Sequence, residues 1–254
     1  MSAPLLPLPD PDERWALFLD MDGTLFDLID DPELVRATPA LLEILDALTE
    51  QLDGALALIS GRDLSAIDRI MAPRRYPAAG SHGAEWRLSE TGDILATAPD
   101  TAALAAAAAE MERFIATCPG VNLERKTQSL ALHYRLQPQA KDQVLTAAEA
   151  VLRRLGEGYR MMPGKGVYEI APAVGDKGVA ITRFLESPPF HGRRPVFAGD
   201  DVTDERGFEV VNQQGGLSIH IGSATETHAC LHCPSPTALR HWLESVLLHA
   251  QRKR

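Results

Sequence analysis

The chain of 254 residues contains only three cysteines, Cys118, Cys230 and Cys233. Three cysteines cannot supply a disulfide framework for a chain of this length, and one of them would remain unpaired. The first 14 residues also lack a basic segment followed by an apolar one, so no export signal is expected. These features predict a reducing compartment, and we expect the protein in the cytoplasm.

Long apolar runs are missing as well, because 18 consecutive apolar residues occur nowhere, and we expect no membrane span. Positive charge is scarce: 25 Lys and Arg against 35 Asp and Glu give a formal net charge of −10. Nucleic acids and anionic membranes attract clustered Lys and Arg, so neither is an expected partner. An anionic small molecule stays possible, since local cations and backbone amides override the global field at a site.

From residue 15 onward, short apolar runs alternate with segments of helical spacing. Residues 15–19 and 55–59 are short apolar runs typical of buried strands, and residues 39–52 and 63–71 have helical spacing. Residues 76–87 are predicted as a strand broken by two glycines. Strands that alternate with helices favour a parallel sheet.

The pattern changes after residue 98. An alanine-rich helix capped by Asp100 precedes a hairpin over 121–135, a helix over 138–155 and a second strand pair over 159–171. The alternation of strands and helices then resumes. The sequence predicts an α/β fold whose Rossmann-like parallel sheet core comprises residues 1–98 and 173–254, with an inserted α+β cap domain for substrate recognition at 99–172.

Two carboxylates, Asp20 and Asp22, follow the first predicted strand. Open α/β sheets bind ligands at the carboxyl ends of their strands, and Gly23 permits a sharp turn there. A single Asp in this position usually caps a turn. Two adjacent carboxylates are costly to bury without a cation, so we interpret them as catalytic, one attacking and one handling a proton.

Ser60 and Gly61 occupy the corresponding place after the next strand. A hydroxyl and exposed backbone amides near a helix start form an anion site, although a Ser-Gly-Arg turn is more often a simple cap. Lys177 opens a later helix, where its charge is unfavourable unless an anion lies beside it. These three residues are predicted to bind phosphate.

Four carboxylates gather after the strand at 195–198, in the segment from Gly199 to Glu205. They would repel one another unless they bind a hard cation, and an all-oxygen set suits Mg²⁺. An acidic helix start explains Asp204 and Glu205 better than it explains Asp200 and Asp201.

Together these segments resemble the haloacid dehalogenase superfamily of phosphotransferases. The resemblance implies that Asp20 is the nucleophile and forms an aspartyl-phosphate, that Asp22 is general acid and then base, and that Ser60 and Lys177 hold the phosphoryl group. It also implies a Mg²⁺ site formed by Asp20, the carbonyl of Asp22, Asp200, Asp204 and Asp201.

Within that superfamily, Gly199 to Glu205 and Gly80 to Glu85 are similar to the trehalose-6-phosphate phosphatase family. The insert also resembles the sugar-binding cap of that family. The implied sugar-binding residues are His82, Glu124, Lys126, Lys165 and Glu169. A solvated sheet face with ordinary ion pairs is the alternative for the four cap residues.

The predicted activity is therefore Mg²⁺-dependent hydrolysis of trehalose 6-phosphate, a small-molecule sugar phosphate. Phosphatases of sucrose 6-phosphate or mannosyl-3-phosphoglycerate are the nearest alternatives. A noncatalytic sensor on the same fold is a further one, but both Asp20 and Asp22 are present. The oligomeric state stays open, with a monomer compatible with the sequence. The residues His228, Cys230, His232 and Cys233 are too closely spaced for a tetrahedral zinc site.

Overall fold

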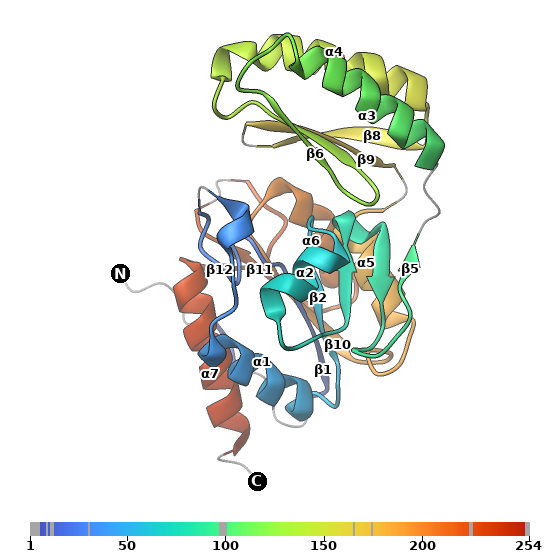
Figure 1. The fold of residues 1–254 in the computed structure, drawn as a ribbon. Coiled ribbons are helices and arrows are strands. Elements are labelled where there is room, and N and C mark those ends of the chain that lie inside the picture. Colours follow the sequence, from blue (N-terminus) through green and yellow to red (C-terminus); the bar gives the residue numbers. More distant parts are fainter. Residues whose placement is uncertain are drawn as a thin grey trace. The chain divides into compact units, whose positions relative to one another are not determined.

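The computed structural model describes residues 6–8, 10, 13–29, 31–96, 101–164, 166–173, 175–223 and 226–251. It divides into two compact units, one formed by Met1–Leu95 with Asp176–Arg254 and the other by Ala96–Gly175. The sequence prediction placed the boundaries after residues 98 and 172. Each unit has its own sheet (Figure 1). Each also has its own hydrophobic core.

The first unit, called the core unit below, is built on a sheet in the order β12-β11-β10-β1-β2-β3-β4-β5 (Figure 1). Neighbouring strands from β12 to β3 are parallel, which confirms the predicted parallel core. The strands are β1 (Trp15–Leu19), β2 (Leu56–Ile59), β3 (Ala78–Gly80), β4 (Glu85–Arg87), β5 (Leu95–Ala96), β10 (Arg194–Gly199), β11 (Leu217–Ile221) and β12 (Leu231–Cys233).

The predicted strand over 76–87 is two strands, and the second departs from the parallel arrangement. β4 pairs antiparallel with β3. Between them Ser81, His82 and Gly83 have φ values of 49°, 54° and 94°. Left-handed conformations at three successive residues reverse the chain direction, so β4 returns beside β3.

Helices cover the core sheet on both faces. β1 to β2 and β10 to β11 step across the sheet in opposite directions, so right-handed crossovers place α1 and α6 on opposite faces. Among the described residues, no helix combines the length and apolarity needed to cross a bilayer. The helices of the core unit are α1 (Pro39–Gln51), α2 (Leu64–Met71), α5 (Lys177–Leu185), α6 (Glu205–Gln213) and α7 (Pro236–Gln251).

Aromatic packing fixes α5 against the central strand. Phe18 of β1 lies 5.9 Å from Phe184 of α5 and 5.6 Å from Phe190, measured between ring centroids, and all three rings are fully buried. Each such pair contributes roughly 0.5–1.5 kcal/mol beyond the area it buries. The C-terminal turn of α5 is thereby packed against β1.

The second unit, called the cap unit below, has a four-stranded antiparallel sheet in the order β6-β7-β9-β8. Two helices lie side by side over one face of it (Figure 1). The predicted cap of the first helix, Asp100, lies outside the described residues. The elements are α3 (Thr101–Ile115), β6 (Asn122–Arg125), β7 (Leu130–His133), α4 (Lys141–Leu155), β8 (Tyr159–Gly164) and β9 (Val167–Pro172).

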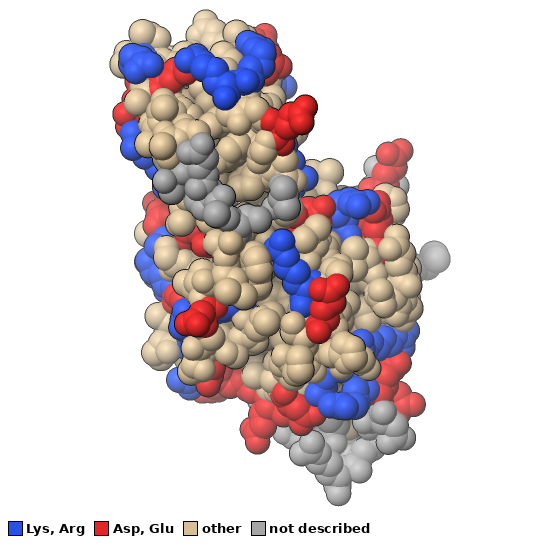
Figure 2. Space-filling model, turned by 90° about the vertical axis from the view of Figure 1, so that its right-hand side faces the viewer, with Lys and Arg blue, Asp and Glu red and all other residues tan. Residues whose placement is uncertain are grey.

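Surface charges of both signs are interspersed on the face drawn in Figure 2. Arg74 with Asp46, and Arg75 with Asp68, are exposed ion pairs of the core unit, at 2.6 Å and 3.2 Å. Such pairs contribute between about 0 and 1 kcal/mol. The buried ionic groups at the carboxyl ends of the core strands are different, because a buried charge needs a partner.

Candidate active site

Asp20 directly follows β1, and the chain turns sharply after it. Its backbone N–H donates to the carbonyl of Ala198 in β10 at 3.0 Å, which fixes the residue at the carboxyl ends of two adjacent strands. Gly23 has a φ of 82°, and a Cβ there would lie 2.1 Å from Oδ2 of Asp200. The absence of a side chain at Gly23 therefore lets the loop after β1 approach Asp200.

Lys177, the first residue of α5, is buried and reaches the same place. Its Nζ donates to Oδ1 of Asp20 at 2.7 Å and to Oδ1 of Asp204 at 2.6 Å. The helix begins here because Asp176 accepts from the N–H of Val179 at 2.8 Å. Since a helix N-terminus disfavours a cation, the two carboxylates stabilise the ammonium.

The acidic segment after β10 has carboxylates with different partners. Oδ2 of Asp204 accepts from the backbone N–H groups of Asp200 and Asp201, at 3.0 Å each. Asp201 is exposed and caps the short 3-10 helix that follows. Glu205 accepts from the hydroxyl of Thr227 at 2.8 Å. The segment is therefore less self-repelling than its sequence suggests, because hydrogen bonds engage several of its carboxylates.

Three of these acids converge. Asp20, Asp200 and Asp204 each offer an oxygen, and the three oxygens lie within 4.8 Å of one another. Of the described residues in the predicted metal set, Asp201 and Asp22 do not join this triad with their carboxylates. The predicted metal contact through the carbonyl of Asp22 stays a prediction.

The pKa values of Asp20, Asp200 and Lys177 are shifted from their ordinary values. Burial raises the pKa of Asp20 well above its usual value, although Lys177 opposes the shift. Burial and the charge of Asp204 raise the pKa of Asp200 to about 6. Burial lowers the pKa of Lys177, but Asp20 and Asp204 outweigh that effect and hold it above its ordinary value. One ammonium faces three carboxylates, so the triad fits a hard divalent cation.

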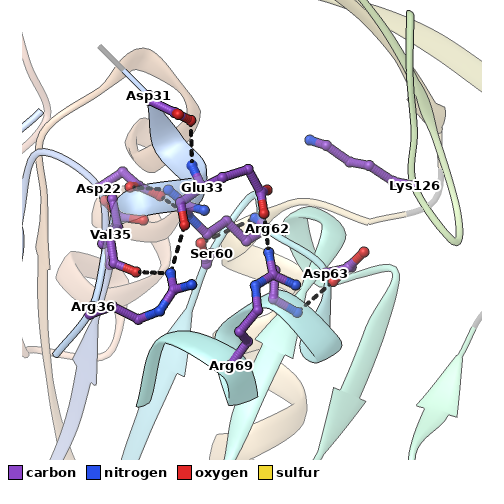
Figure 3. A network of polar contacts seen from close by, with 12 residues as sticks. Asp22, Asp31, Glu33, Val35, Arg36, Ser60, Arg62, Asp63, Arg69 and Lys126 are labelled. Atoms are coloured by element: carbon purple, nitrogen blue, oxygen red, sulfur yellow. Dashed lines mark hydrogen bonds and ion pairs between the residues drawn. The ribbon is translucent and has the colours of Figure 1, made fainter. Parts of the chain in front are cut away.

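Asp22 has a different partner, Arg62. Nε of Arg62 donates to Oδ2 of Asp22 at 2.6 Å, and Nη2 donates to Oδ1 at 2.8 Å (Figure 3). The side chain of Asp22 is 33% exposed and that of Arg62 is 13% exposed. Asp20 and Asp22 are two residues apart in the sequence, yet they form ion pairs with different side chains, Lys177 and Arg62.

Ser60 and Gly61 lie in the turn after β2, and His82, in the turn after β3, packs against them. Ser60 follows β2 and is buried, and its Oγ accepts from the N–H of Arg62 at 3.1 Å. The N–H of His82 donates to the carbonyl of Ser60 at 3.0 Å. A Cβ at Gly61 would lie 2.6 Å from Cε1 of His82, so the imidazole lies directly against this glycine. The structure thus brings a predicted sugar-binding residue beside the predicted phosphate-binding turn.

The cap residues gather on one face of the cap sheet. Glu124, Ala131 and Glu169 are directly opposite one another on β6, β7 and β9, so their side chains share a face. Nζ of Lys126 donates to Oε2 of Glu169 at 2.9 Å. The opposite face supplies the hydrophobic core. The fourth predicted cap residue, Lys165, lies outside the described residues.

Three residues near these groups escaped the sequence prediction. Arg62 and His133 had no assigned role, and Ser129 was not considered. Nε2 of His133 lies 2.8 Å from Oε2 of Glu124, and Oγ of Ser129 donates to Oε1 of Glu169 at 2.5 Å. Period-two spacing places Ser129 and His133 on the face of Ala131, which is the signal that could have found them.

The family model described as trehalose-phosphatase matches residues 18–233. The chain belongs to this family. A trehalose-6-phosphate phosphatase of Escherichia coli (strain K12) is 39% identical over 254 residues, covering 100% of this chain and 94% of that protein. A probable trehalose-phosphate phosphatase of Sinorhizobium fredii (strain NBRC 101917 / NGR234) is 42% identical, covering 93% and 89%.

Solved structures agree with the membership in the trehalose-phosphatase family. A trehalose-6-phosphate phosphatase related protein superposes with a TM-score of 0.80 at 27% identity, covering 94% of this chain and 99% of that one. The C-terminal domain of the Candida albicans trehalose-6-phosphate phosphatase gives a TM-score of 0.78 at 23% identity, covering 93% of each, which supports the fold. The resemblance to haloacid dehalogenase superfamily phosphatases is confirmed.

Proposed function

We propose that this chain hydrolyses trehalose 6-phosphate to trehalose and phosphate, with Mg²⁺ as cofactor. The observation that carries the proposal is the buried group at the ends of β1 and β10, where Asp20 contacts Lys177 and converges with Asp200 and Asp204. The substrate is that named for the relatives from E. coli and S. fredii, which match over nearly the full chain.

In the proposed reaction, a carboxylate oxygen of Asp20 attacks the phosphorus while the bond to the sugar oxygen breaks. Asp22 gives a proton to the departing sugar oxygen. Asp22 then takes a proton from the water that attacks the aspartyl-phosphate, which releases phosphate and regenerates Asp20. Mg²⁺ bound by the triad would neutralise charge on the phosphoryl oxygens.

Two further groups would bind the phosphoryl oxygens. The Ser60 hydroxyl lies at the end of β2, the strand beside β1, and is a suitable donor. Lys177 is held at the start of α5, where its ammonium and the helix N-terminus both favour an anion. Both side chains are already hydrogen-bonded, Ser60 to the N–H of Arg62 and Lys177 to Asp20 and Asp204, which limits reorganisation during the reaction.

The cap face is proposed to select the sugar. Glu124, Lys126 and Glu169 offer donors and acceptors on one sheet face, the pattern that polyhydroxyl ligands require. Lys165 and His82 are proposed as further sugar contacts. The protein is proposed to work in the cytoplasm, since all three of its cysteines are free thiols.

The test is phosphate release from trehalose 6-phosphate, glucose 6-phosphate and sucrose 6-phosphate, with Mg²⁺ or with EDTA. We expect a preference for trehalose 6-phosphate that needs the metal. Asp20→Asn should lower the rate by about 10⁴-fold or more, because the nucleophile is lost. Asp27→Asn is the matched control. This carboxylate is exposed, and its hydrogen bond to Nη2 of Arg240 is long, at 3.4 Å.

Preference for another ester would keep the chemistry and contradict the proposed sugar. Phosphate release that survives Asp20→Asn would contradict the proposed nucleophile. No release from any ester would favour a noncatalytic sensor.

A further inference from the structure

Arg62 contacts Asp22 in the most specific geometry available to an ion pair. Two parallel N–H donors, Nε and Nη2, reach the two oxygens of one carboxylate at 2.6 Å and 2.8 Å (Figure 3). A bidentate fork fixes the plane of the carboxylate as well as its position, which a single ammonium cannot do. Each oxygen retains a second lone pair, so the fork leaves room for proton transfer.

The backbone of Arg62 is also fixed. Its N–H donates to Oγ of Ser60 at 3.1 Å, and its carbonyl accepts from the N–H of Ser81 at 2.7 Å. A Cβ at Gly80 would lie 2.8 Å from that carbonyl, so the turns after β2 and β3 are in close contact at this point. The guanidinium therefore extends from a rigid base that also holds the predicted phosphate-binding hydroxyl.

Asp22 has less support of its own. It follows β1 in the loop that turns at Gly23, and its side chain is one-third exposed. An exposed carboxylate on a loop samples several rotamers, whereas a general acid must lie within about 3.2 Å of the atom it serves. The fork from Arg62 removes that freedom.

We propose that Arg62 is a positioning residue that holds the carboxylate of Asp22 in the orientation needed for its acid and base steps. Arg62 neither gains nor loses a proton and forms no bond to substrate phosphorus. Arg62 also links the turn that carries Ser60 to the loop that carries Asp22, which fixes the position of one relative to the other. The inference rests on the role proposed above for Asp22, and it concerns the position of that side chain.

The leaving group separates a positioning role from a structural one. A sugar oxygen leaves poorly without a proton, whereas 4-nitrophenolate leaves readily without one. We expect Arg62→Ala to slow single-turnover cleavage of trehalose 6-phosphate by about 10- to 100-fold, the cost of a misplaced catalytic group. Single-turnover release of 4-nitrophenol from 4-nitrophenyl phosphate should change by less than about threefold, because it precedes the base step and needs no proton from Asp22. Arg62→Lys should retain part of the sugar rate, since it keeps the charge without the fork.

A double-mutant cycle tests whether Arg62 acts through Asp22. In an Asp22→Asn background, Arg62→Ala should cost less than about twofold on the sugar ester, because residues that act as a unit are not additive. Arg69→Ala is the matched control: this arginine of α2 is exposed and pairs with the exposed Glu33 at 2.8 Å (Figure 3). Thermal melting of each variant identifies any that fail to fold.

Three results would overturn the inference. Equal losses on the sugar and aryl esters would assign Arg62 to phosphoryl binding, as would a raised KM at unchanged kcat. An undiminished loss in the Asp22→Asn background would show that Arg62 acts independently of Asp22. If wild type leaves trehalose 6-phosphate intact, the proposed substrate fails, and the cycle is run with whichever alkyl phosphate of the panel it cleaves.

Discussion

Two lysines, one in each unit, contact carboxylates in different surroundings. Lys177 of the core unit lies between Asp20 and Asp204, and its side chain is 3% exposed. Lys126 of the cap unit donates to Glu169 from a sheet face, and these side chains are 14% and 11% exposed. The core lysine is part of a buried ionic group, and the cap lysine belongs to a surface that retains access to water.

The difference indicates a separation of tasks. Removing one member of a buried ionic group leaves the others uncompensated, so stability and chemistry depend on the same residues. A partly exposed pair contributes less to stability, and its members are available to exchange a protein contact for a ligand hydroxyl. We therefore expect substitutions in the core site to reduce stability and kcat together, and substitutions on the cap face to change KM.

Of the substitutions that compare the two units, Lys177→Gln should have the largest effect. Without the ammonium, Asp20 and Asp204 stay buried beside each other, and the metal-free protein should lose about 3–5 kcal/mol of unfolding free energy. Phosphate release should fall by about 10²- to 10³-fold or more, since a donor to the phosphoryl group is lost. Chemical denaturation and steady-state kinetics measure both. Lys126→Gln is the comparison, with an expected stability loss of less than about 1 kcal/mol; equal losses in the two variants would break the distinction.

Metal binding to the triad should depend on pH. The pKa of Asp200 is raised to about 6 from an ordinary 3.8, so between these values the folded metal-free protein holds a proton that the unfolded chain has released. Metal-free stability therefore contains a contribution that is lost as pH rises through 6. Mg²⁺ must displace that proton, so its stabilising effect should be largest above pH 7 and should decrease toward pH 5.

Differential scanning calorimetry with Mg²⁺ and with EDTA, at several pH values, measures how the metal-induced shift in melting temperature depends on pH. At a metal concentration roughly 100-fold above Kd the stabilisation is about 2.7 kcal/mol, which corresponds to several degrees. Asp200→Asn should remove most of the shift at pH 7.5, whereas Asp27→Asn should leave it intact. A metal shift of the same size at pH 5 and pH 7.5 would argue that the triad is not the binding site.

The fold of the core unit was largely predictable, because its strands and helices repeat signals that local chemistry sets. Thr38 and Asp176 cap helices that begin where the sequence indicated. The reversal at β4 was not predictable in the same way. It depends on left-handed backbone conformations at Ser81 and His82, which few residues other than glycine adopt readily.

Partners of the site residues were harder to predict than their positions. Strand ends placed Asp20, Asp22 and Ser60 correctly at one edge of the sheet. The sequence gives no indication, however, that Asp22 contacts Arg62, because that pair joins two loops 40 residues apart. The separation of Asp201 from the triad is similar, since backbone hydrogen bonding decides which carboxylate turns inward.

The smallest expected effect lies on the cap face, at Ser129. Its hydroxyl is fully buried and donates to Oε1 of Glu169 at 2.5 Å, while Lys126 donates to Oε2 of the same carboxylate at 2.9 Å. Ser129→Ala leaves Lys126 in place, so Glu169 keeps its charge partner but loses one hydrogen bond.

If Glu169 contacts the sugar, this looser carboxylate should raise KM for trehalose 6-phosphate by roughly 10-fold or less, with kcat within about twofold of wild type. Ser129→Thr keeps the hydroxyl and should restore most of the affinity. A fall in kcat at unchanged KM would place Ser129 with the core chemistry, and would remove the distinction between a cap face that binds and a core that reacts.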